Sequence, residues 1–423
     1  MKKILILLII WISGGLCYAQ QLDISGDFRA RSEYRNGYGT LKPDTAKAAC
    51  FVVQRVRLNV DFSSKHLKMR VSPQNYHVWG DVTTTAKSDL GNAFHEAWAE
   101  IIAGPKISLR LGRQELAYDD HRILGNVDWA MQARSHDALL LKYMPDTSQR
   151  IHLGIAYNVN KESNFKENYL LPQYKALQFL WYHGNFKQFG VSGLLLNNGM
   201  PFVVSGKEKT VYSQTISTQL TYKFGKFNAA VTAALQTGKI NNNSVQAHYY
   251  AAQLRYQNTS GFAAGLGGEY LSGKAQDDIS TTVKSFNPLY GTNHKFNGYM
   301  DYFYVGNHIN SVGLIDMYAT LSYQKKQLRV QLQPHVFSAA AAIYQSGVKQ
   351  DNLLGTEIDL TANYQLFDNV AIEGGIAKML ATSSMEILKG GNKDNGNYWA
   401  YLSVKCTPHL FSYKNENPKN DKL

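Results

Sequence analysis

The sequence predicts an all-β protein: a transmembrane, antiparallel, up-and-down β-barrel of about 18 strands, with about 16 as the alternative count. Three observations lead to this prediction. A secretory signal begins the chain, segments of alternating polarity recur along it, and short and long connections between these segments alternate. The composition agrees, because 12% of the residues are aromatic and only 18% are charged. A barrel with an apolar outer face and a polar interior has such a composition.

Residues 1–19 have the features of a secretory signal peptide: two lysines, an apolar stretch and a small-residue cleavage site. We assign residues 20–411 to the barrel and residues 412–423 to a polar tail that we expect to be disordered. No later apolar run reaches the roughly 18 residues of a membrane-spanning helix. We therefore expect the protein in the outer membrane of a Gram-negative bacterium, in contact with its lipids.

Alternation is clear in the segment 50–63, where Val56 and Leu58 alternate with Arg55 and Arg57. In a membrane barrel the apolar set faces lipid and the polar set lines the lumen. The alternative is a secreted β-sandwich, in which the apolar set forms the core.

The connections favour the barrel. Short turns such as Gly104-Pro105 alternate with longer loops, among them 118–133, 199–209 and 274–310. Outer-membrane barrels have short periplasmic turns and longer extracellular loops, whereas a sandwich has no reason to separate loop lengths in this way.

The formal net charge is +12, and most arginines fall in the first third of the chain. Arginines that line a pore select anions and bind carboxylates in bidentate pairs. We therefore predict an anionic solute. The alternative is that the arginines brace the wall by pairing with acids on neighbouring strands. The predicted pore-lining residues are Arg29, Arg31, Arg55, Arg57, Arg110, Arg113, Arg134 and Lys142.

Two loops are predicted to fold into the pore. Loop 118–133 is a candidate constriction, in which acidic residues pair with Arg122 and Arg134. Loop 274–310 is a candidate plug whose aromatic residues are placed to stack on sugar rings; the alternative is packing of this loop on itself. The constriction candidates are Asp119, Asp120, Arg122, Asp128 and Asp137, and the plug candidates are Tyr290, His294, Phe296, Tyr299 and Asp301.

Catalytic and metal chemistry are not predicted. Asp119-Asp120-His121 supplies too few converging ligands for a metal site. Serine and histidine residues are scattered, without the arrangement that a nucleophilic enzyme needs. We expect no cofactor, no enzymatic activity and no nucleic-acid partner.

The segment LGRQELAYDD (111–120), followed by Arg122, Asp128-Trp129, Arg134 and Asp137, resembles the signature of the alginate-export family of outer-membrane porins. The segment FNPLYGT (286–292) looks like the Bacteroidetes-type members of this family. The resemblance implies an 18-stranded barrel whose electropositive, arginine-rich constriction passes an acidic polysaccharide or oligosaccharide such as alginate, with a periplasmic export partner. The chain is short for an alginate exporter, so a general or neutral-sugar porin and an adhesin or structural barrel remain alternatives.

Arg113 does not fit simple alternation, which directs its side chain at lipid from its position beside Leu111. An arginine at the bilayer midplane costs about 2–4 kcal/mol. We predict a β-bulge near Gly112 that turns Arg113 inward. The alternative is that Arg113 lies above the hydrocarbon.

Overall fold

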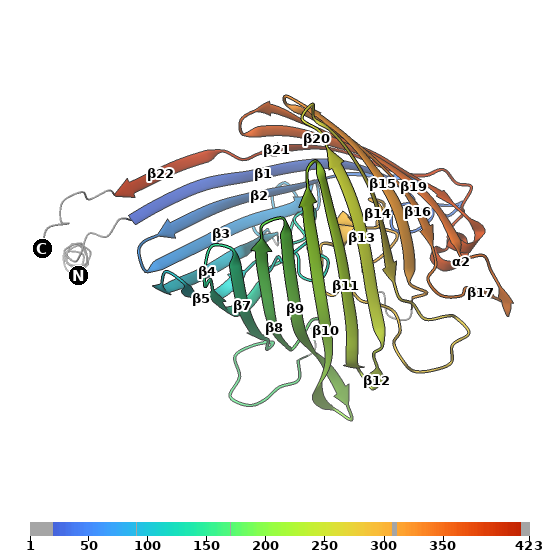
Figure 1. Cartoon of the computed structure of the whole chain (residues 1–423), viewed down its shortest axis with the longest axis horizontal. Helices are drawn as coiled ribbons and strands as arrows, with labels where there is room; N and C mark the ends of the chain where they lie inside the picture. The colour runs from blue at the N-terminus through green and yellow to red at the C-terminus, as the bar shows by residue number, and fades with distance from the viewer. Residues whose placement is uncertain (1–19, 90, 170, 307–310, 416–423) are drawn as a thin grey trace, which may run out of the picture.

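The computed structural model describes residues 20–89, 91–169, 171–306 and 311–415, so the predicted signal peptide lies outside the described residues. Eighteen strands form a closed antiparallel barrel (Figure 1). They are β1 (Gln20–Asn36), β2 (Ala49–Ser63), β3 (Leu67–Val78), β4 (Asn92–Gly104), β5 (Ile107–Gln114), β6 (His136–Tyr143), β7 (Gln149–Tyr157), β8 (Ala176–Phe186), β9 (Phe189–Val204), β10 (Lys207–Phe224), β11 (Phe227–Ile240), β13 (Ala247–Gln257), β14 (Phe262–Leu271), β15 (Leu314–Lys325), β16 (Leu328–Ser338), β19 (Leu353–Phe367), β20 (Val370–Ala381) and β21 (Asn397–Cys406).

Short elements complete the chain. They are β12 (Asn243–Ser244), β17 (Tyr344–Gln345), β18 (Val348–Lys349), β22 (His409–Asn415), the 3₁₀-helix η2 (Asn293–Lys295) and the helix α2 (Ser383–Lys389). Within the described residues, no helix has the length and hydropathy needed to cross a membrane.

The barrel closes through β1, which pairs with β2 on one side and with β21 and β22 on the other. Every other barrel strand pairs antiparallel with the barrel strands before and after it in the chain. This arrangement confirms the predicted up-and-down barrel, with the higher of the two strand counts.

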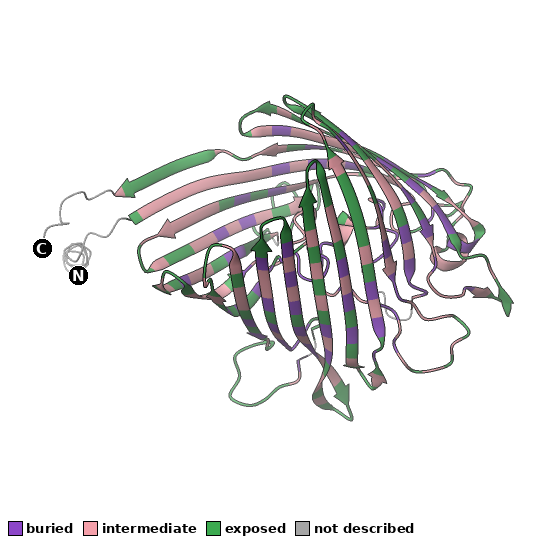
Figure 2. Cartoon of the chain, in the orientation of Figure 1, coloured by how far each residue is buried: buried purple, intermediate pink, exposed green. Residues whose placement is uncertain are grey.

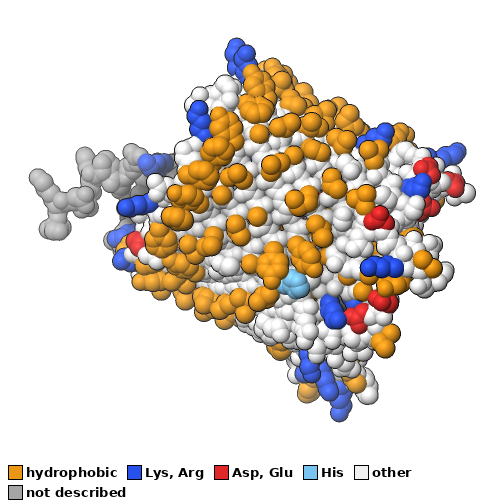
Figure 3. Space-filling view, turned by 45° about the vertical axis from the view of Figure 1, so that its right-hand side comes forward, with side chains coloured by type: hydrophobic (Ala, Val, Ile, Leu, Met, Phe, Trp, Pro, Cys, Tyr) orange, Lys and Arg blue, Asp and Glu red, His pale blue; other side chains and the backbone are white. Residues whose placement is uncertain are grey.

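The two faces of the wall follow the alternation of the sequence. On β2, Val56 and Leu58 are 47% and 39% exposed, whereas Arg55 and Arg57 are buried. Buried and exposed residues alternate along the strands in Figure 2. Hydrophobic side chains cover the outer wall in Figure 3, and most charged side chains on that face lie toward its ends. The apolar face is therefore the outer, lipid-facing surface.

Long loops gather at one end of the barrel and short turns at the end where β1 begins and β22 finishes (Figure 1). We refer to these as the extracellular and periplasmic ends. The predicted loop 199–209 is wrong. Strands β9 and β10 continue to a two-residue turn at Ser205-Gly206, with φ values of 50° and 75°. Positive φ at both central residues suits a type I′ hairpin, whose twist matches the flanking strands.

The chain extends the barrel beyond the boundary predicted at residue 411. Strand β21 ends at Cys406, the Pro408 carbonyl accepts a 2.9 Å hydrogen bond from Gly26 N, and β22 then pairs with β1 as far as Asn415. Residues 412–415 of the predicted tail are thus strand, because their backbone finds partners on the edge of β1. The remainder of the tail lies outside the described residues.

Candidate functional site

Two loops fold into the barrel and meet there: loop 115–135, between β5 and β6, and loop 272–313, between β14 and β15. Their backbones are joined at the isolated bridge between Leu124 and Tyr290. The hydrogen bonds are Gly125 N to Tyr290 O at 2.9 Å, Tyr290 N to Ile123 O at 3.0 Å, and Thr292 N to His121 O at 2.9 Å. The loops thus form a single partition, which we call the loop junction.

The loop junction is anchored to the wall of β1 and β2 by Asp128. Its carboxylate lies 2.8 Å from Arg29 Nη2 and 2.9 Å from Arg55 Nη1. Burial of this carboxylate raises its pKa, but the charges and hydrogen bonds of the two arginines outweigh burial and lower the pKa of Asp128 to about 2. Asp128 is therefore an ionised anchor.

Trp129 extends the same attachment. Arg31 donates to the Trp129 carbonyl oxygen at 2.8 Å, and its guanidinium lies 3.8 Å from the centre of the Trp129 ring. The other partner of Arg31 is Glu33, at 2.8 Å. His294 of loop 272–313 stacks on Trp129 with ring centres 4.2 Å apart. Hydrogen bonds, a cation–π contact and stacking thus fix the tip of loop 115–135.

The opposite wall is acidic and holds the loop junction from the other side. Arg122 is fully buried and donates to Glu269 of β14 at 2.7 Å and to Asn297 at 2.8 Å. Its guanidinium also lies 4.4 Å from the centre of the Phe296 ring. Met300 N donates to Glu357 of β19 at 2.8 Å.

The remaining predicted cations of the wall also have hydrogen-bond or ion-pair partners. Arg57 donates to Gln74, while Arg110 and Lys142 both reach the Glu100 carboxylate, at 2.7 and 2.9 Å. These contacts match the alternative prediction, in which the cations brace the wall by pairing with residues of neighbouring strands. The sequence could not separate the two interpretations, because it shows which face a side chain takes but not which neighbour it meets.

Arg113 and Asp137 follow the exposed phase of β5 and β6 at the extracellular rim, where both also border the extracellular cavity described below. Arg113 Nε and Nη2 donate to the two carboxylate oxygens of Asp137 at 3.0 and 2.9 Å. The register of β4 and β5 runs unbroken through Gly112, and the predicted bulge is absent from these described strands. Arg113 is the second-last residue of β5, near the extracellular end, where Asp137 balances its charge.

The acidic residues of loop 118–133 have partners that the sequence did not predict. Asp119 accepts from Ser192 at 2.5 Å and Trp181 at 3.0 Å, and burial raises its pKa. Asp120 accepts from the backbone N of Arg122. The predicted pairing of the loop's own acids with Arg122 and Arg134 is therefore wrong, since the ion-pair partner of Arg122 is on the wall.

The plug candidates contact the loop junction or the acidic wall. His294 lies 2.7 Å from Asp301, and Tyr299 N donates to Asp359 at 3.3 Å. Burial raises the pKa of Tyr299 to about 12. Tyr290 donates to Asn198 at 2.6 Å. This loop thus packs on the barrel wall, rather than only on itself.

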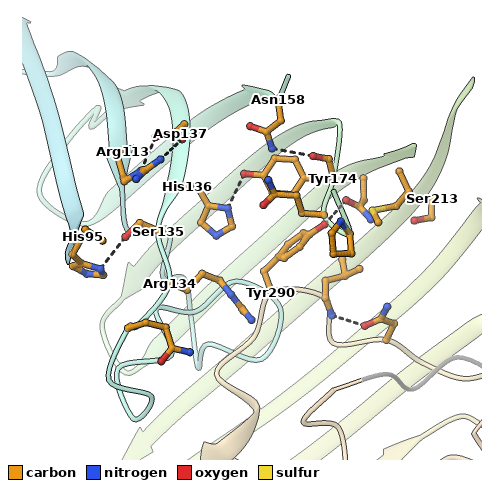
Figure 4. Close-up of a pocket in the computed structure, with 18 of the residues that line it drawn as sticks. His95, Arg113, Arg134, Ser135, His136, Asp137, Asn158, Tyr174, Ser213 and Tyr290 are labelled. Atoms are coloured by element: carbon orange, nitrogen blue, oxygen red, sulfur yellow. Dashed lines mark hydrogen bonds and ion pairs between the residues drawn. The ribbon is translucent and has the colours of Figure 1, made fainter. Parts of the chain in front are cut away.

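Cavities lie on both sides of the loop junction. The extracellular cavity has a volume of about 620 Å³ and is lined by Arg134, His136, Tyr174 and Tyr290 (Figure 4). Two periplasmic cavities, of about 290 and 620 Å³, share Lys295, Tyr299 and Gln331. We call the extracellular cavity the upper vestibule, and the two periplasmic cavities together the lower vestibule.

Sequence reasoning missed four cations that line the lower vestibule: Lys295, Arg255, Lys326 and Arg329. A signal was available for the two arginines, because each lies beside an outward leucine in an alternating strand. Lys295 carries no such signal, since it belongs to η2 within a loop. Among the described residues, no group of three or more His, Cys, Asp or Glu is arranged to hold a metal ion.

Comparison with known proteins supports the fold and the family resemblance. Residues 20–176 match the family model described as alginate export. No curated protein matches the chain. Among solved structures, OccK11 (OpdR) of Pseudomonas aeruginosa is 10% identical with a TM-score of 0.61, over 93% of this chain and 96% of that chain. OccAB1 of Acinetobacter baumannii is 11% identical with a TM-score of 0.64, over 92% and 97%.

A third similar structure is that of Pseudomonas aeruginosa OpdK with vanillate, which is 10% identical with a TM-score of 0.60, over 92% of this chain and 99% of that chain. Identities this low show a shared fold alone. The chain is thus an outer-membrane β-barrel with the fold of a porin channel, and its residues 20–176 match the alginate-export family.

Proposed function

We propose that this porin channel passes a small anionic solute across the outer membrane. The observation that carries the proposal is a set of cations without carboxylate partners along the vestibules: Arg134 above the loop junction, and Lys295, Arg255 and Arg329 below it. Within the described residues, Arg134 donates to the Gly291 carbonyl, Lys295 to the Asp120 carbonyl and Arg329 to Gln331. Their charges remain available to a solute.

Most acids near the path are neutralised. Glu269 pairs with Arg122, and Asp316 lies 2.9 Å from His335. Asp120 and Glu373 also line the lower vestibule, where Glu373 accepts from Asn363 at 3.0 Å. The four free cations exceed these two carboxylates, and a surplus of positive charge in a narrow aqueous path favours anions.

The comparisons support the same solute class. The matched family is described as alginate export, and alginate is a polyanion. OpdK was crystallised with vanillate, a carboxylate. A monomer or short oligomer suits this channel better than a polymer, since three backbone hydrogen bonds join the loops across the path.

The test is the reversal potential of the purified channel in a planar bilayer under a KCl gradient. We expect chloride to carry more current than potassium. Arg134→Gln and Arg329→Gln should each lower this preference. Lys378→Gln removes an equal charge from the outer face of β20, between the exposed Ile376 and Leu380, and should leave the preference unchanged. A preference for potassium would reject the proposal, and equal permeability would favour the neutral-sugar porin.

A further inference from the structure

We propose that the upper vestibule is a binding pocket for a small aromatic carboxylate, with Arg134 and His136 holding the carboxylate and apolar walls holding the ring. The inference rests on the proposed passage of anions and adds a solute class and a site. His136 is the first residue of β6, Arg134 lies two residues before it in loop 115–135, and both approach the ring of Tyr290 (Figure 4). The distances to its centre are 6.0 Å from the Arg134 guanidinium carbon and 5.7 Å from the centre of the His136 ring.

His136 is a buried polar group with one unused nitrogen. Its side chain is 4% exposed, and its Nδ1 lies 2.9 Å from the Tyr174 hydroxyl. Its Nε2 is buried and has no hydrogen-bond partner among the described residues. When the tyrosine hydroxyl donates to Nδ1, the ring proton is on Nε2, which becomes a donor. A buried donor without a partner costs free energy, and a ligand oxygen would recover that cost.

Arg134 supplies the charge. One guanidinium nitrogen donates to Gly291 O at 3.1 Å, and no carboxylate pairs with it within the described residues. Burial lowers the pKa of Arg134, so its environment penalises the charged form. An incoming carboxylate removes this penalty and accepts charge-assisted hydrogen bonds. Arg134 and the Nε2 proton of His136 together give the carboxylate two donors.

Polar residues make up more than half of the lining of the upper vestibule, but one part of it is apolar and aromatic and suits a ring. Tyr174 and Tyr290 meet edge to face, with ring centres 5.2 Å apart. Met200, Ile240 and Leu289 line the same cavity and pack against the buried core. Apolar and aromatic surface binds a flat apolar ring, whereas a sugar would lose hydrogen bonds to water there. The Ser213 hydroxyl and the side-chain NH₂ of Asn198 line the same cavity and could bind a ring hydroxyl.

The experiment titrates the detergent-purified full-length protein with 4-hydroxybenzoate by isothermal titration calorimetry. Two further ligands isolate the two contacts: glucuronate has the charge without the aromatic ring, and phenol has the ring without the carboxylate. We expect 4-hydroxybenzoate to bind at least about tenfold more tightly than either, because each lacks one contact. Equal affinity for glucuronate would overturn the aromatic assignment, and equal affinity for phenol would overturn the carboxylate site.

Variants test the two donors. Arg134→Gln should weaken 4-hydroxybenzoate binding about tenfold or more. His136→Phe keeps a ring against Tyr290 but removes the donor, and should weaken binding severalfold. Unchanged affinity in both variants would overturn the proposal. Lys378→Gln on the outer face of β20 is the matched control and should bind as the unchanged protein does.

Heat-modifiable migration on gels will show whether each variant is folded. If His136→Phe fails to fold, His136→Gln replaces it, because the Gln amide can still donate and should retain part of the affinity. Failure of the pocket is distinguishable from failure of the proposed function. Anion selectivity without 4-hydroxybenzoate binding rejects the pocket alone, and binding in a cation-selective channel rejects the selectivity alone.

Discussion

Arg29 donates two hydrogen bonds to Asp128, one to the carboxylate Oδ2 and one to the carbonyl oxygen, each at 2.8 Å. Arg55 donates to the second carboxylate oxygen and also reaches Asp27 at 2.7 Å. Two inward arginines of neighbouring strands thus bind the same loop residue. The arginines of this wall therefore anchor the loop. The proposed anion selectivity rests instead on cations that do not pair with a carboxylate.

Asp128→Asn should loosen the loop junction from β1 and β2. The variant removes the charge that both arginines share and leaves them buried beside a neutral amide. Truncating one partner of a buried, hydrogen-bonded ion pair costs about 2–5 kcal/mol, and the partial exposure of Asp128 places this case at the low end. We expect a larger and noisier single-channel conductance. The folded barrel should persist, and an unchanged conductance would show that Asp128 does not hold the loop.

The same ion pairs predict a response to acid. The pKa of Asp128 is about 2 when the loop is attached, and close to the ordinary aspartate value of about 3.9 when the loop is detached. Because the attached pKa is lower, the stabilisation is complete above the ordinary value and is lost as the pH falls toward 2. We expect steady conductance from neutral pH to about pH 4, and a rise below it.

Asp128→Asn is the control for that acid response. Other carboxylates titrate in the same range, so the part due to Asp128 is the difference between the two proteins. Identical acid responses in the two would contradict the assignment.

Arg122 should be the residue of the loop junction most sensitive to replacement. It is buried against Glu269, so Arg122→Met leaves that carboxylate uncompensated. Breaking a buried ion pair from one side costs about 3–5 kcal/mol. We expect a lower unfolding temperature on heat-modifiability gels. Arg122→Lys keeps the charge and should recover part of the loss. A variant with the double change Arg122→Met and Glu269→Leu should be more stable than Arg122→Met alone.

Gly125→Ala should separate the two loops without altering any charge. A Cβ at this position would lie 2.3 Å from Thr292 Oγ1 and 2.8 Å from Thr292 N. Both distances are too short, and the backbone atom cannot rotate away. We expect faster proteolysis of loop 272–313 in the intact barrel. Gly193→Ala on β9 meets nothing within 4 Å and needs no positive φ, so it controls for a glycine replacement at a site without a contact. Equal proteolysis in both variants would contradict a tight junction.

The sequence by itself determined the barrel and the face on which most wall residues lie. Alternation has a period of two, so it places Arg55 inside and Val56 outside without knowledge of any partner. The alternation of short turns and long loops then indicated an up-and-down order of the strands. The prediction failed at 199–209, because a type I′ turn depends on two positive φ values that Ser205-Gly206 signals only weakly.

Only the tertiary structure decided which inward charges remain free. Arg55 and Asp128 lie 73 positions apart in the chain, and Arg122 and Glu269 lie 147 apart. No local pattern reports such pairs, since they form only when the loops fold back into the closed barrel. Closure therefore neutralises the arginine-rich wall, and the cations left for a solute include Arg134 in the upper vestibule and Arg329 in the lower.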